Sequence, residues 1–271
     1  MEDDVKMGEE IHMQSTWVMK NIRYDYEGLA KMVNLPVPVV RCIINRGPAS
    51  LAEVKAYLDP SLKDLHDGGR MKGMDLAVDL LLKAVEDEEK ILLVGDYDID
   101  GTMSMYIALK ALEQIGAVVD YDIPDRVMDG YGINVAMVEK AKENGVSLLV
   151  TFDNGISAVE AVERAKELGM EVIITDHHEV PFEEVEGVVK EILPPANAVV
   201  NPKQKSCPYP FKGLCGAAIA YKLMEKLFQA LGLEETAIEE YLPFAAIATV
   251  GDIMPLMGEN RILVKKGLER L

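Results

Sequence analysis

The sequence predicts an α/β domain built on a mostly parallel β-sheet with helices on both faces. Three short apolar runs, ILLVGDYD from residue 91, SLLVTFD from residue 147 and EVIITD from residue 171, alternate with segments of helical character. Their apolar residues are continuous rather than alternating, which is typical of strands buried on both faces of a parallel sheet. The alternation of strands with helices indicates the same fold. Acidic residues close each run, and such sheets hold their ligands at that end.

The chain before the first of these runs has a different character. Residues 1–12 are acidic and polar, and we expect them to be disordered. Residues 13–90 predict a small helical segment that packs on the core, in which Ser50 and Glu53 form a capping box at a helix start. Residues 91–271 then form the α/β domain.

Each further element has its own sequence signal. Asn134 is suited to cap a helix, and the small residues of GAAIA, from residue 216, allow a helix to pack closely. The fixed φ of Pro243 suits the first turn of the apolar helix that follows it. The last stretch is charged, and no signal ends its helix, so we expect a continuation. We predict helices at 26–33, after Ser50, and at 74–87, 102–115, 134–143, 157–168, 213–230, 234–242, 244–250 and 260–271, with further strands in AVVDYDIP and NAVVNPKQ.

Composition narrows the possible functions. With 28 basic and 46 acidic residues the net charge is −18, so a polyanion can bind only through a local basic strip or through bound metal ions. Three cysteines without a close pair argue against a disulfide framework and fit a reducing cytoplasm. The acidic N-terminus does not resemble a signal peptide, and no apolar run approaches the roughly 18 residues that span a membrane.

Three carboxylates follow the first strand at close spacing. Asp96 and Asp98 are alternate residues that can point to one side, Asp100 lies two residues further on, and Gly101 lets the chain turn into a helix. A helix start decorated with acids explains one carboxylate well and three poorly. Acidic groups and imidazoles that converge at a buried sheet edge repel one another unless a cation lies among them. The pattern therefore favours a metal site, with more than one ion.

The other two strand ends add further ligand types. Asp153 alone is equally well explained by an Asx turn before Asn154, but it ends a strand of the same sheet, from which one carboxylate can bridge two ions. His177 and His178 are half of the histidines in the chain and follow an acid, which favours chemistry over a structural role. Asp252 on its own reads as a loop acid.

Six motifs occur in an order that resembles the DHH phosphoesterase superfamily, and within it the RecJ exonuclease family. The motifs are GDYDIDG, YDIPDRVMDGYGIN, TFDNGIS, TDHH, VVNPKQKSCPYPFKGLCGA and TVGDIMPLMGENRILVKKGL, and the match extends from about residue 17 to the end. Met103 stands where the family usually has a small hydroxyl residue, and Gly251 where it often has Ala. Both departures keep the acids.

The resemblance implies roles for individual residues. Asp96 belongs to the same acidic cluster and helps to hold a ligand or water, and His178 acts near the scissile phosphate. Arg126 is similar to a basic residue that contacts phosphate, although a solvated loop arginine is an equal alternative. The implied ligands of two Mn²⁺ or Mg²⁺ ions are Asp98, Asp100, Asp153, His177 and Asp252.

The resemblance also implies an activity. Members of the RecJ family degrade single-stranded DNA from the 5′ end to mononucleotides, and recombination and repair proteins are possible partners. The imidazole tilts the metal preference towards Mn²⁺. Family members continue into a DHHA1 domain and an OB-fold that this sequence lacks, so we expect an N-terminal catalytic domain with weak activity. Alternatives are a phosphatase or nanoRNase-like hydrolase of short oligonucleotides or nucleoside bisphosphates, a scaffold, or a fragment that is inactive without its C-terminal domain.

Overall fold

The structure is a computed structural model that describes residues 20, 22–124, 132–185 and 187–271 of the 271-residue chain. The disorder expected for residues 1–12 and the phosphate contact expected of Arg126 both lie outside the described residues. The chain divides into two compact units, with the boundary between Lys55 and Ala56.

The first unit is helical. It contains α1 (Tyr26–Val33), α2 (Val37–Asn45) and most of α3 (Leu51–Leu58). The capping box at α3 is confirmed, because the Glu53 carboxylate accepts the Ser50 N–H at 3.0 Å and the Ser50 hydroxyl accepts the Glu53 N–H at 3.2 Å. The apolar faces of these helices supply its buried residues, which are Tyr26, Leu29, Ala30, Val40, Ile43, Ile44 and Val54.

The second unit contains the sheet. Residues 56–90 belong to this unit together with residues 91–271. The domain boundary that the sequence analysis places after residue 90 stays a prediction. Its elements in chain order are η1 (Leu62–Asp64), η2 (Gly68–Arg70), α4 (Met74–Glu86), β1 (Ile91–Val94), α5 (Ile99–Gln114), β2 (Val119–Asp122), α6 (Val135–Glu143), β3 (Leu148–Phe152), α7 (Val159–Glu167), β4 (Glu171–Thr175), β5 (Phe182–Val185), β6 (Val188–Glu191), β7 (Ala198–Val200), α8 (Gly216–Ala230), η3 (Glu235–Tyr241), α9 (Leu242–Gly251) and α10 (Gly258–Leu268).

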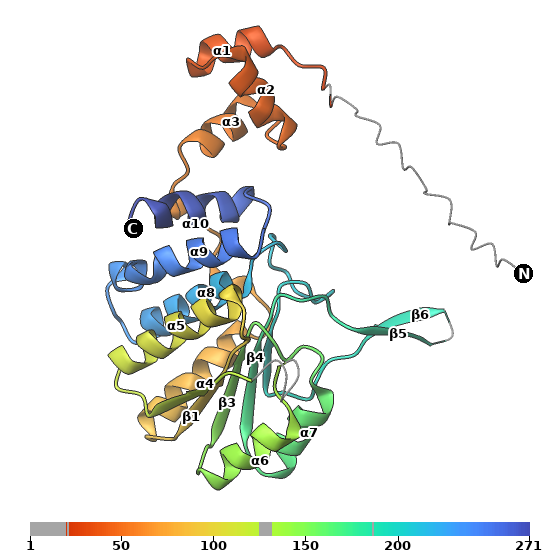
Figure 1. The fold of residues 1–271 in the computed structure, drawn as a ribbon, viewed down its shortest axis with the longest axis vertical. Coiled ribbons are helices and arrows are strands. Elements are labelled where there is room, and N and C mark those ends of the chain that lie inside the picture. The colour runs from red at the N-terminus through yellow and green to blue at the C-terminus, as the bar shows by residue number, and fades with distance from the viewer. Residues whose placement is uncertain (1–19, 21, 125–131, 186) are drawn as a thin grey trace, which may run out of the picture. The chain divides into compact units, whose positions relative to one another are not determined.

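Five parallel strands form the main sheet in the order β2-β1-β3-β4-β7 (Figure 1). Val94 of β1 lies opposite Asp122 of β2 and Thr151 of β3, and Thr151 in turn lies opposite Ile174 of β4. With this register the carboxyl ends of β1, β3 and β4 reach the same edge of the sheet.

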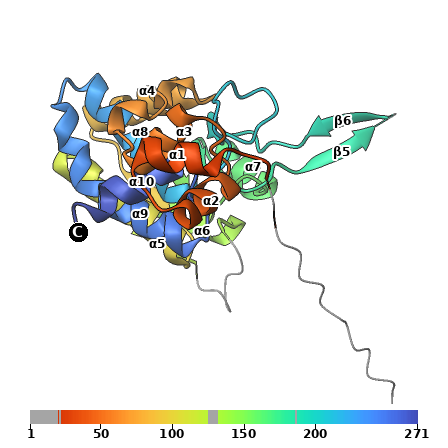
Figure 2. The same cartoon turned by 90° about the horizontal axis from the view of Figure 1, so that it is seen from above.

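Helices cover both faces of the sheet, so the predicted fold class is confirmed. Ile91 and Leu93 of β1 join one core with α4, α5 and α8, whereas Leu92 and Val94 join a second core with α6 and α7. This alternation explains why the strands read as continuous apolar runs, since both faces are buried. The covering of both faces is visible in the two views (Figures 1 and 2).

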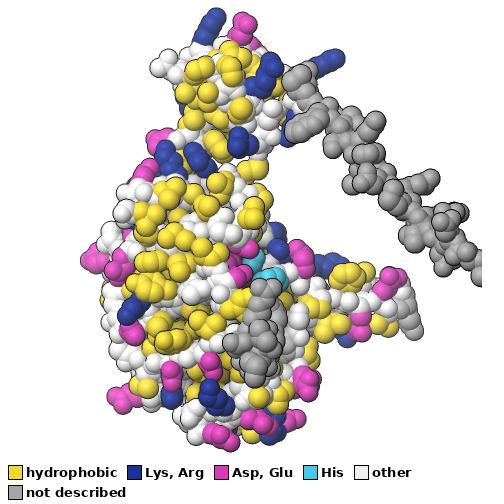
Figure 3. Space-filling model, in the orientation of Figure 1, with side chains coloured by type: hydrophobic (Ala, Val, Ile, Leu, Met, Phe, Trp, Pro, Cys, Tyr) yellow, Lys and Arg dark blue, Asp and Glu magenta, His cyan; other side chains and the backbone are white. Residues whose placement is uncertain are grey.

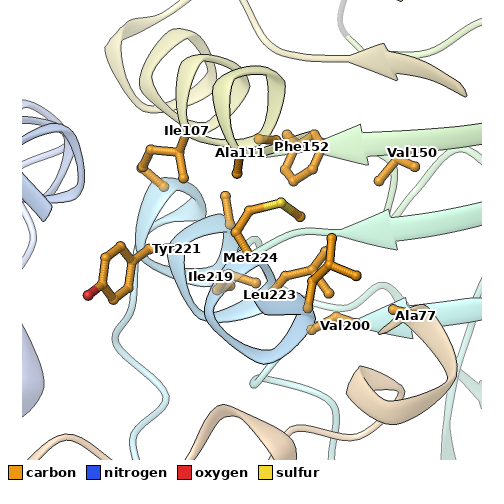
Figure 4. Packing of buried hydrophobic residues seen from close by; sticks show 14 of the residues in the cluster. Ala77, Ile107, Ala111, Val150, Phe152, Val200, Ile219, Tyr221, Leu223 and Met224 are labelled. Carbon is orange, nitrogen blue, oxygen red and sulfur yellow. The ribbon is translucent and has the colours of Figure 1, made fainter. Parts of the chain in front are cut away.

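The largest core forms around α8. Figure 4 shows Ile219, Leu223 and Met224 of this helix in one cluster with residues of α5, α4 and the strands. Phe152 and Val200 are fully buried on the strand side of the cluster. The packing fixes the N-terminus of α8 beside the carboxyl edge of the sheet, which matters for the site below.

Several element boundaries differ from the prediction. Helix α5 begins at Ile99 rather than at residue 102, because Asp98 caps it by accepting the Gly101 N–H at 2.9 Å. Helix α8 begins at Gly216 rather than at residue 213, and the segment from Glu235 is a 3₁₀-helix. The hairpin of β5 and β6 projects from the unit in both views and was not predicted (Figures 1 and 2). In the part of the chain that the structure describes, no helix is long and apolar enough to cross a membrane.

Candidate metal centre

Seven side chains that the sequence singled out gather at the carboxyl edge of the sheet. They come from the junction of β1 and α5, where Asp100 lies in the first turn of the helix, from the ends of β3 and β4, and from the end of α9. The strand register brings the first three segments together, and Asp252 at the C-cap of α9 joins them. The seven residues are Asp96, Asp98, Asp100, Asp153, His177, His178 and Asp252. Arg126 lies outside the described part of the chain, so the structure does not place it.

His177 lies among three of these carboxylates. Its Nε2 atom is 3.1 Å from Oδ1 of Asp153, 3.5 Å from Oδ2 of Asp100 and 3.8 Å from Oδ2 of Asp252. Its Nδ1 atom is buried and has no hydrogen-bond partner among the described residues. The imidazole therefore directs Nε2 at a cluster of oxygen atoms.

The residues form three overlapping groups whose ligand atoms lie within 4.8 Å of one another. Asp153 belongs both to the group with Asp96 and Asp98 and to the group with the two histidines. His177 belongs to the histidine group and also to a group with Asp100 and Asp252. Asp153 thus stands between two sets of ligand atoms, as a bridging carboxylate would.

Asp153 has an unusual backbone conformation. Its φ is +63°, in the left-handed region that non-glycine residues seldom adopt. The neighbouring contacts hold it there, since the Asp153 N–H donates to the Thr175 carbonyl at 3.0 Å and the Thr151 hydroxyl donates to the Asn154 carbonyl at 2.8 Å. Strain of this kind concentrates at functional sites, where the surrounding structure over-determines it.

The N-terminus of α8 supports Asp100. The Gly216 and Ala217 N–H groups donate to the two oxygens of this buried carboxylate at 2.6 and 2.7 Å. A helix N-terminus favours negative charge, so α8 orients Asp100 towards the cluster. Residue 216 must be glycine, because a Cβ there would lie 2.7 Å from the Cβ of Asp153.

Asp176 orients His178. One Asp176 oxygen lies 2.7 Å from Nδ1 of His178, and the same oxygen accepts the N–H groups of His177 and His178. The hydrogen bond that Nδ1 of His178 donates to the Asp176 carboxylate raises the pKa of His178 above its usual range. Burial alone would raise the pKa of Asp176, but the His178 contacts and backbone N–H donors, including that of Ile156, outweigh it and lower that pKa.

The donor set fits divalent cations. Burial, followed by the charges of Asp100 and Asp98, raises the pKa of Asp153 to about 10, and burial also raises the pKa of Asp100. Burial likewise raises the pKa of Asp96. A carboxyl with the pKa of Asp153 holds its proton at neutral pH unless the positive charge of a cation replaces that proton. Several carboxylate oxygens with one imidazole nitrogen suit Mn²⁺ or Mg²⁺.

Three contributors had no assigned role in the sequence analysis. Asp176 had a visible signal, since it is the first acid of the TDHH motif. Asn154 donates from Nδ2 to the carbonyls of Val94 and Phe152 at 3.0 and 2.9 Å, which ties the ends of β1 and β3 together. No local pattern indicated that Gly216 would contact Asp100, which is more than a hundred residues away.

A cavity of about 400 Å³ adjoins His178. Its walls come from the start of α6, including Asn134, and from residues 155–161 at the start of α7. Asp176 lies in the same wall as His178. The candidate metal centre therefore borders a space in which a small group can lie beside the imidazole.

Comparison with known proteins bears on this arrangement. Residues 90–249 match the family model of the DHH family, N-terminal domain. The single-stranded-DNA-specific exonuclease RecJ of Bacillus subtilis (strain 168) is 40% identical over 245 residues, which cover 90% of this chain and 29% of that protein. The corresponding protein of Haemophilus influenzae is 39% identical over 222 residues, 79% of this chain and 37% of that protein. The chain thus spans about a third of the length of these curated relatives.

Solved structures show the same relationship. The crystal structure of RecJ in complex with Mn²⁺ from Thermus thermophilus matches with a TM-score of 0.71 at 30% identity, over 90% of this chain and 33% of that chain. A crystal structure of exonuclease RecJ bound to manganese matches with a TM-score of 0.66 at 34% identity, over 78% of this chain and 50% of that chain. The resemblance drawn from the motifs is confirmed, and the chain belongs to the DHH family.

Proposed function

We propose that this protein hydrolyses phosphodiester bonds of single-stranded DNA, working from the 5′ end and releasing 5′-mononucleotides. The observation that carries the proposal is the gathering of five carboxylates and two imidazoles at one sheet edge. The relatives support it, because the proteins that are 34–40% identical and cover most of this chain carry the name single-stranded-DNA-specific exonuclease. The cytoplasmic location expected from the cysteines stays a prediction.

The residues that would hold two divalent ions are those predicted from the sequence. Asp153 stands between the two ligand groups and would bridge the ions, with His177 supplying the single nitrogen ligand. When bound, such ions neutralise charge on the phosphate and lower the pKa of an attacking water. We expect Mn²⁺ rather than Mg²⁺, because an imidazole nitrogen suits Mn²⁺ better as a ligand. Two related RecJ structures contain manganese, which supports this expectation. The remaining ligands would be Asp98, Asp100 and Asp252.

The other residues of the site would orient and move protons. Asp176 engages Nδ1 of His178, so the opposite ring nitrogen, Nε2, is the one that can meet a phosphate oxygen. The raised pKa keeps His178 protonated to a higher pH, which suits it to donate a hydrogen bond or a proton near the phosphate. Asp96, buried at 3% exposure, would help to hold a ligand or water.

Degradation of a 3′-labelled single strand in Mn²⁺ tests the proposal. Wild type should shorten the strand from its 5′ end and release mononucleotides, whereas Asp153→Asn should not. Asp79→Asn is the matched control. It makes the same chemical change away from the site, because Asp79 is exposed on α4. Equal rates for wild type and Asp153→Asn would overturn the role of Asp153.

The alternatives from the sequence predict different outcomes. A hydrolase of short oligonucleotides or nucleoside bisphosphates should cleave a dinucleotide faster than a long strand. A fragment that depends on further domains should bind Mn²⁺ with no cleavage of any strand. We expect weak cleavage with little preference for strand length. Partners among recombination and repair proteins remain part of the proposal.

A further inference from the structure

The segment between β7 and α8 has an unusual charge. Residues 201–212 contain Lys203, Lys205 and Lys212 and no acidic residue, in a chain whose net charge is −18. A polyanionic substrate meets repulsion over most of such a surface, so a local group of cations decides where it can lie. The position of these lysines relative to the metal centre therefore indicates where a polyanionic strand can lie.

One side chain attaches this segment to His178. Asn201 donates from Nδ2 to the His178 carbonyl at 2.9 Å and accepts the Lys203 N–H on Oδ1 at 2.8 Å. The ammonium of Lys203 lies 2.9 Å from Oε1 of Glu179, the residue after His178. Lys203 is thus held next to the candidate catalytic histidine.

Further contacts continue the row of cations along the segment. Lys72, from the loop before α4, donates from Nζ to the Ser206 hydroxyl at 2.8 Å. Lys212 donates from Nζ to the Cys207 carbonyl at 2.8 Å. These four residues, Lys72, Lys203, Lys205 and Lys212, are called the lysine strip.

The backbone under the lysine strip is firmly held. Gln204 is buried and donates from Nε2 to the carbonyls of Val199 and Asn201. The Lys205 N–H donates to the Glu191 carboxylate at 2.6 Å, which ties the segment to the end of β6. The face in Figure 3 shows basic side chains close to histidine, near the base of the β5–β6 hairpin. The cations are therefore placed before any ligand arrives.

We propose that the lysine strip binds the phosphates of a single nucleic-acid strand whose end lies at the metal centre. The inference rests on the proposed function and adds the path of the substrate. Lysine ammonium groups bind phosphates as point charges without reading bases, so the strip would serve strands of any sequence. Glu179 competes with the strand for Lys203. Removing the charge of Glu179 should therefore strengthen strand binding, whereas removing lysines of the strip should weaken it.

Strand binding measured without divalent metal isolates the strip from catalysis. The probe is a 3′-labelled oligodeoxythymidine in EDTA, followed by fluorescence anisotropy at several salt concentrations. For single strands each phosphate contact contributes about −0.7 to the slope of log K against log salt, or about five-fold in affinity near 0.1 M salt. The Lys203→Ala/Lys205→Ala double variant should lose about 25-fold in affinity and about 1.4 from the magnitude of this slope.

A matched control removes two lysines elsewhere. Lys83 and Lys142 lie in the last turns of α4 and α6, which precede β1 and β3 and so end at the edge of the sheet opposite the metal centre. Lys83→Ala/Lys142→Ala therefore makes the same change in net charge. This control should bind like wild type. Glu179→Gln should bind more tightly than wild type, because it frees Lys203. Unchanged binding by the Lys203/Lys205 double variant, weaker binding by Glu179→Gln, or no strand binding by wild type at low salt would each overturn the proposal.

A small substrate separates this proposal from the proposed function. Hydrolysis of bis(p-nitrophenyl) phosphate in Mn²⁺ needs the metal centre, but this diester has a single phosphate, the one that is cleaved, and no further phosphate for the lysine strip to bind. The Lys203/Lys205 double variant should retain this hydrolysis at the wild-type rate. A wild type that hydrolyses neither this diester nor a DNA strand would contradict the proposed function and leave the strand-binding result to decide on the strip.

Discussion

Nε2 of His177 lies 3.1 Å from Oδ1 of Asp153, although the two residues come from the ends of different strands. The contact joins the group that contains Asp96 and Asp98 to the group that contains Asp100 and Asp252. A buried carboxylate whose pKa is raised to about 10 and a buried imidazole face each other here. Such a pair is costly to bury unless a proton or a cation lies between the two groups.

The contact leads to a prediction about metal preference. His177→Gln replaces the only nitrogen ligand of the proposed set with an amide oxygen donor. We expect Mn²⁺ affinity to fall by more than about 10-fold, since even residues that only orient a ligand change metal affinity by roughly 10–100-fold. Mg²⁺ affinity should fall less, because Mg²⁺ prefers oxygen ligands. Isothermal titration calorimetry with each metal measures both changes, and an equal loss for the two metals would contradict the assignment.

A second prediction concerns Asp176 as the residue that positions His178. Asp176→Asn should lower the rate of strand cleavage by about 10–100-fold. It should also move the alkaline limb of the pH–rate profile to lower pH, because the hydrogen bond that the Asp176 carboxylate accepts is what raises the pKa of His178. A protonated His178 is available only below its pKa, so losing the carboxylate narrows the active range from the alkaline side.

The controls for this prediction use the histidine itself. His178→Gln should remove the alkaline limb altogether, since the imidazole whose titration is proposed to cause that limb is gone. Asp176→Asn with an unchanged pH profile and an unchanged rate would show that Asp176 only stabilises the fold.

The sheet and most of the site could be predicted because both follow from local patterns. The strands are apolar runs, and the carboxyl ends of parallel strands share an edge, so Asp98, Asp153 and His177 had to approach one another once the strands were identified. The helix starts also have local causes, as the Asp98 and Asn134 caps show. The predicted start of α5 lies three residues late because the prediction places the turn into the helix at Gly101, whereas Asp98 caps a helix that begins at Ile99.

The rest depends on tertiary contacts that no short pattern records. Gly216 donates to Asp100 across more than a hundred residues, and only the packing of α8 on the sheet brings them together. The β5–β6 hairpin was missed because its apolar residues, such as Phe182 and Val188, remain exposed, at 67% and 66%, and no core selects their spacing. In α2, VPVVRCIIN has a β-branched run that does not indicate a helix, yet Pro38 lies in its first turn, where the fixed φ of proline suits a helix start.

A third prediction concerns pH and stability through Glu225 on α8. Burial raises the pKa of Glu225, with Lys222 and Lys226 opposing the shift and Asp67 and Glu259 adding to it. A carboxyl whose pKa is raised in the folded state binds its proton more tightly there than in the unfolded chain. Its contribution to stability therefore falls as pH rises above the unfolded value of 4.5, until the folded-state pKa is passed.

Glu225→Gln should remove this pH dependence. The variant should melt at a higher temperature than wild type at neutral pH, and the difference should vanish as the pH falls to about 4 and below, where the carboxyl becomes protonated in both the folded and the unfolded chain. Thermal unfolding in EDTA across this range measures the effect. Glu183→Gln, on the exposed β5 strand, makes the same change in charge. Its melting temperature should differ from that of wild type by nearly the same amount at every pH. A constant difference between Glu225→Gln and wild type at all pH values would contradict the mechanism.

The fourth prediction concerns the buried ion pair between α8 and α10. Nζ of Lys222 lies 2.9 Å from Oε1 of Glu259, and the two side chains are 0% and 2% exposed. The Tyr209 hydroxyl donates to the other Glu259 oxygen at 2.6 Å, and Lys222 donates to the His66 carbonyl at 2.8 Å. The network ties α8, which carries the amides that hold Asp100, to α10 and to the loop before η2.

Lys222→Met should destabilise the protein by about 3–5 kcal/mol, because it leaves the Glu259 carboxylate buried without its cation. Adding Glu259→Gln should recover part of the loss, since a neutral amide costs less to bury than an uncompensated charge. Urea denaturation of wild type, both single variants and the double variant gives the coupling free energy directly. A loss below about 1 kcal/mol for Lys222→Met, in the range of exposed ion pairs, would mean that water or another donor compensates Glu259 and that the network does not anchor α8.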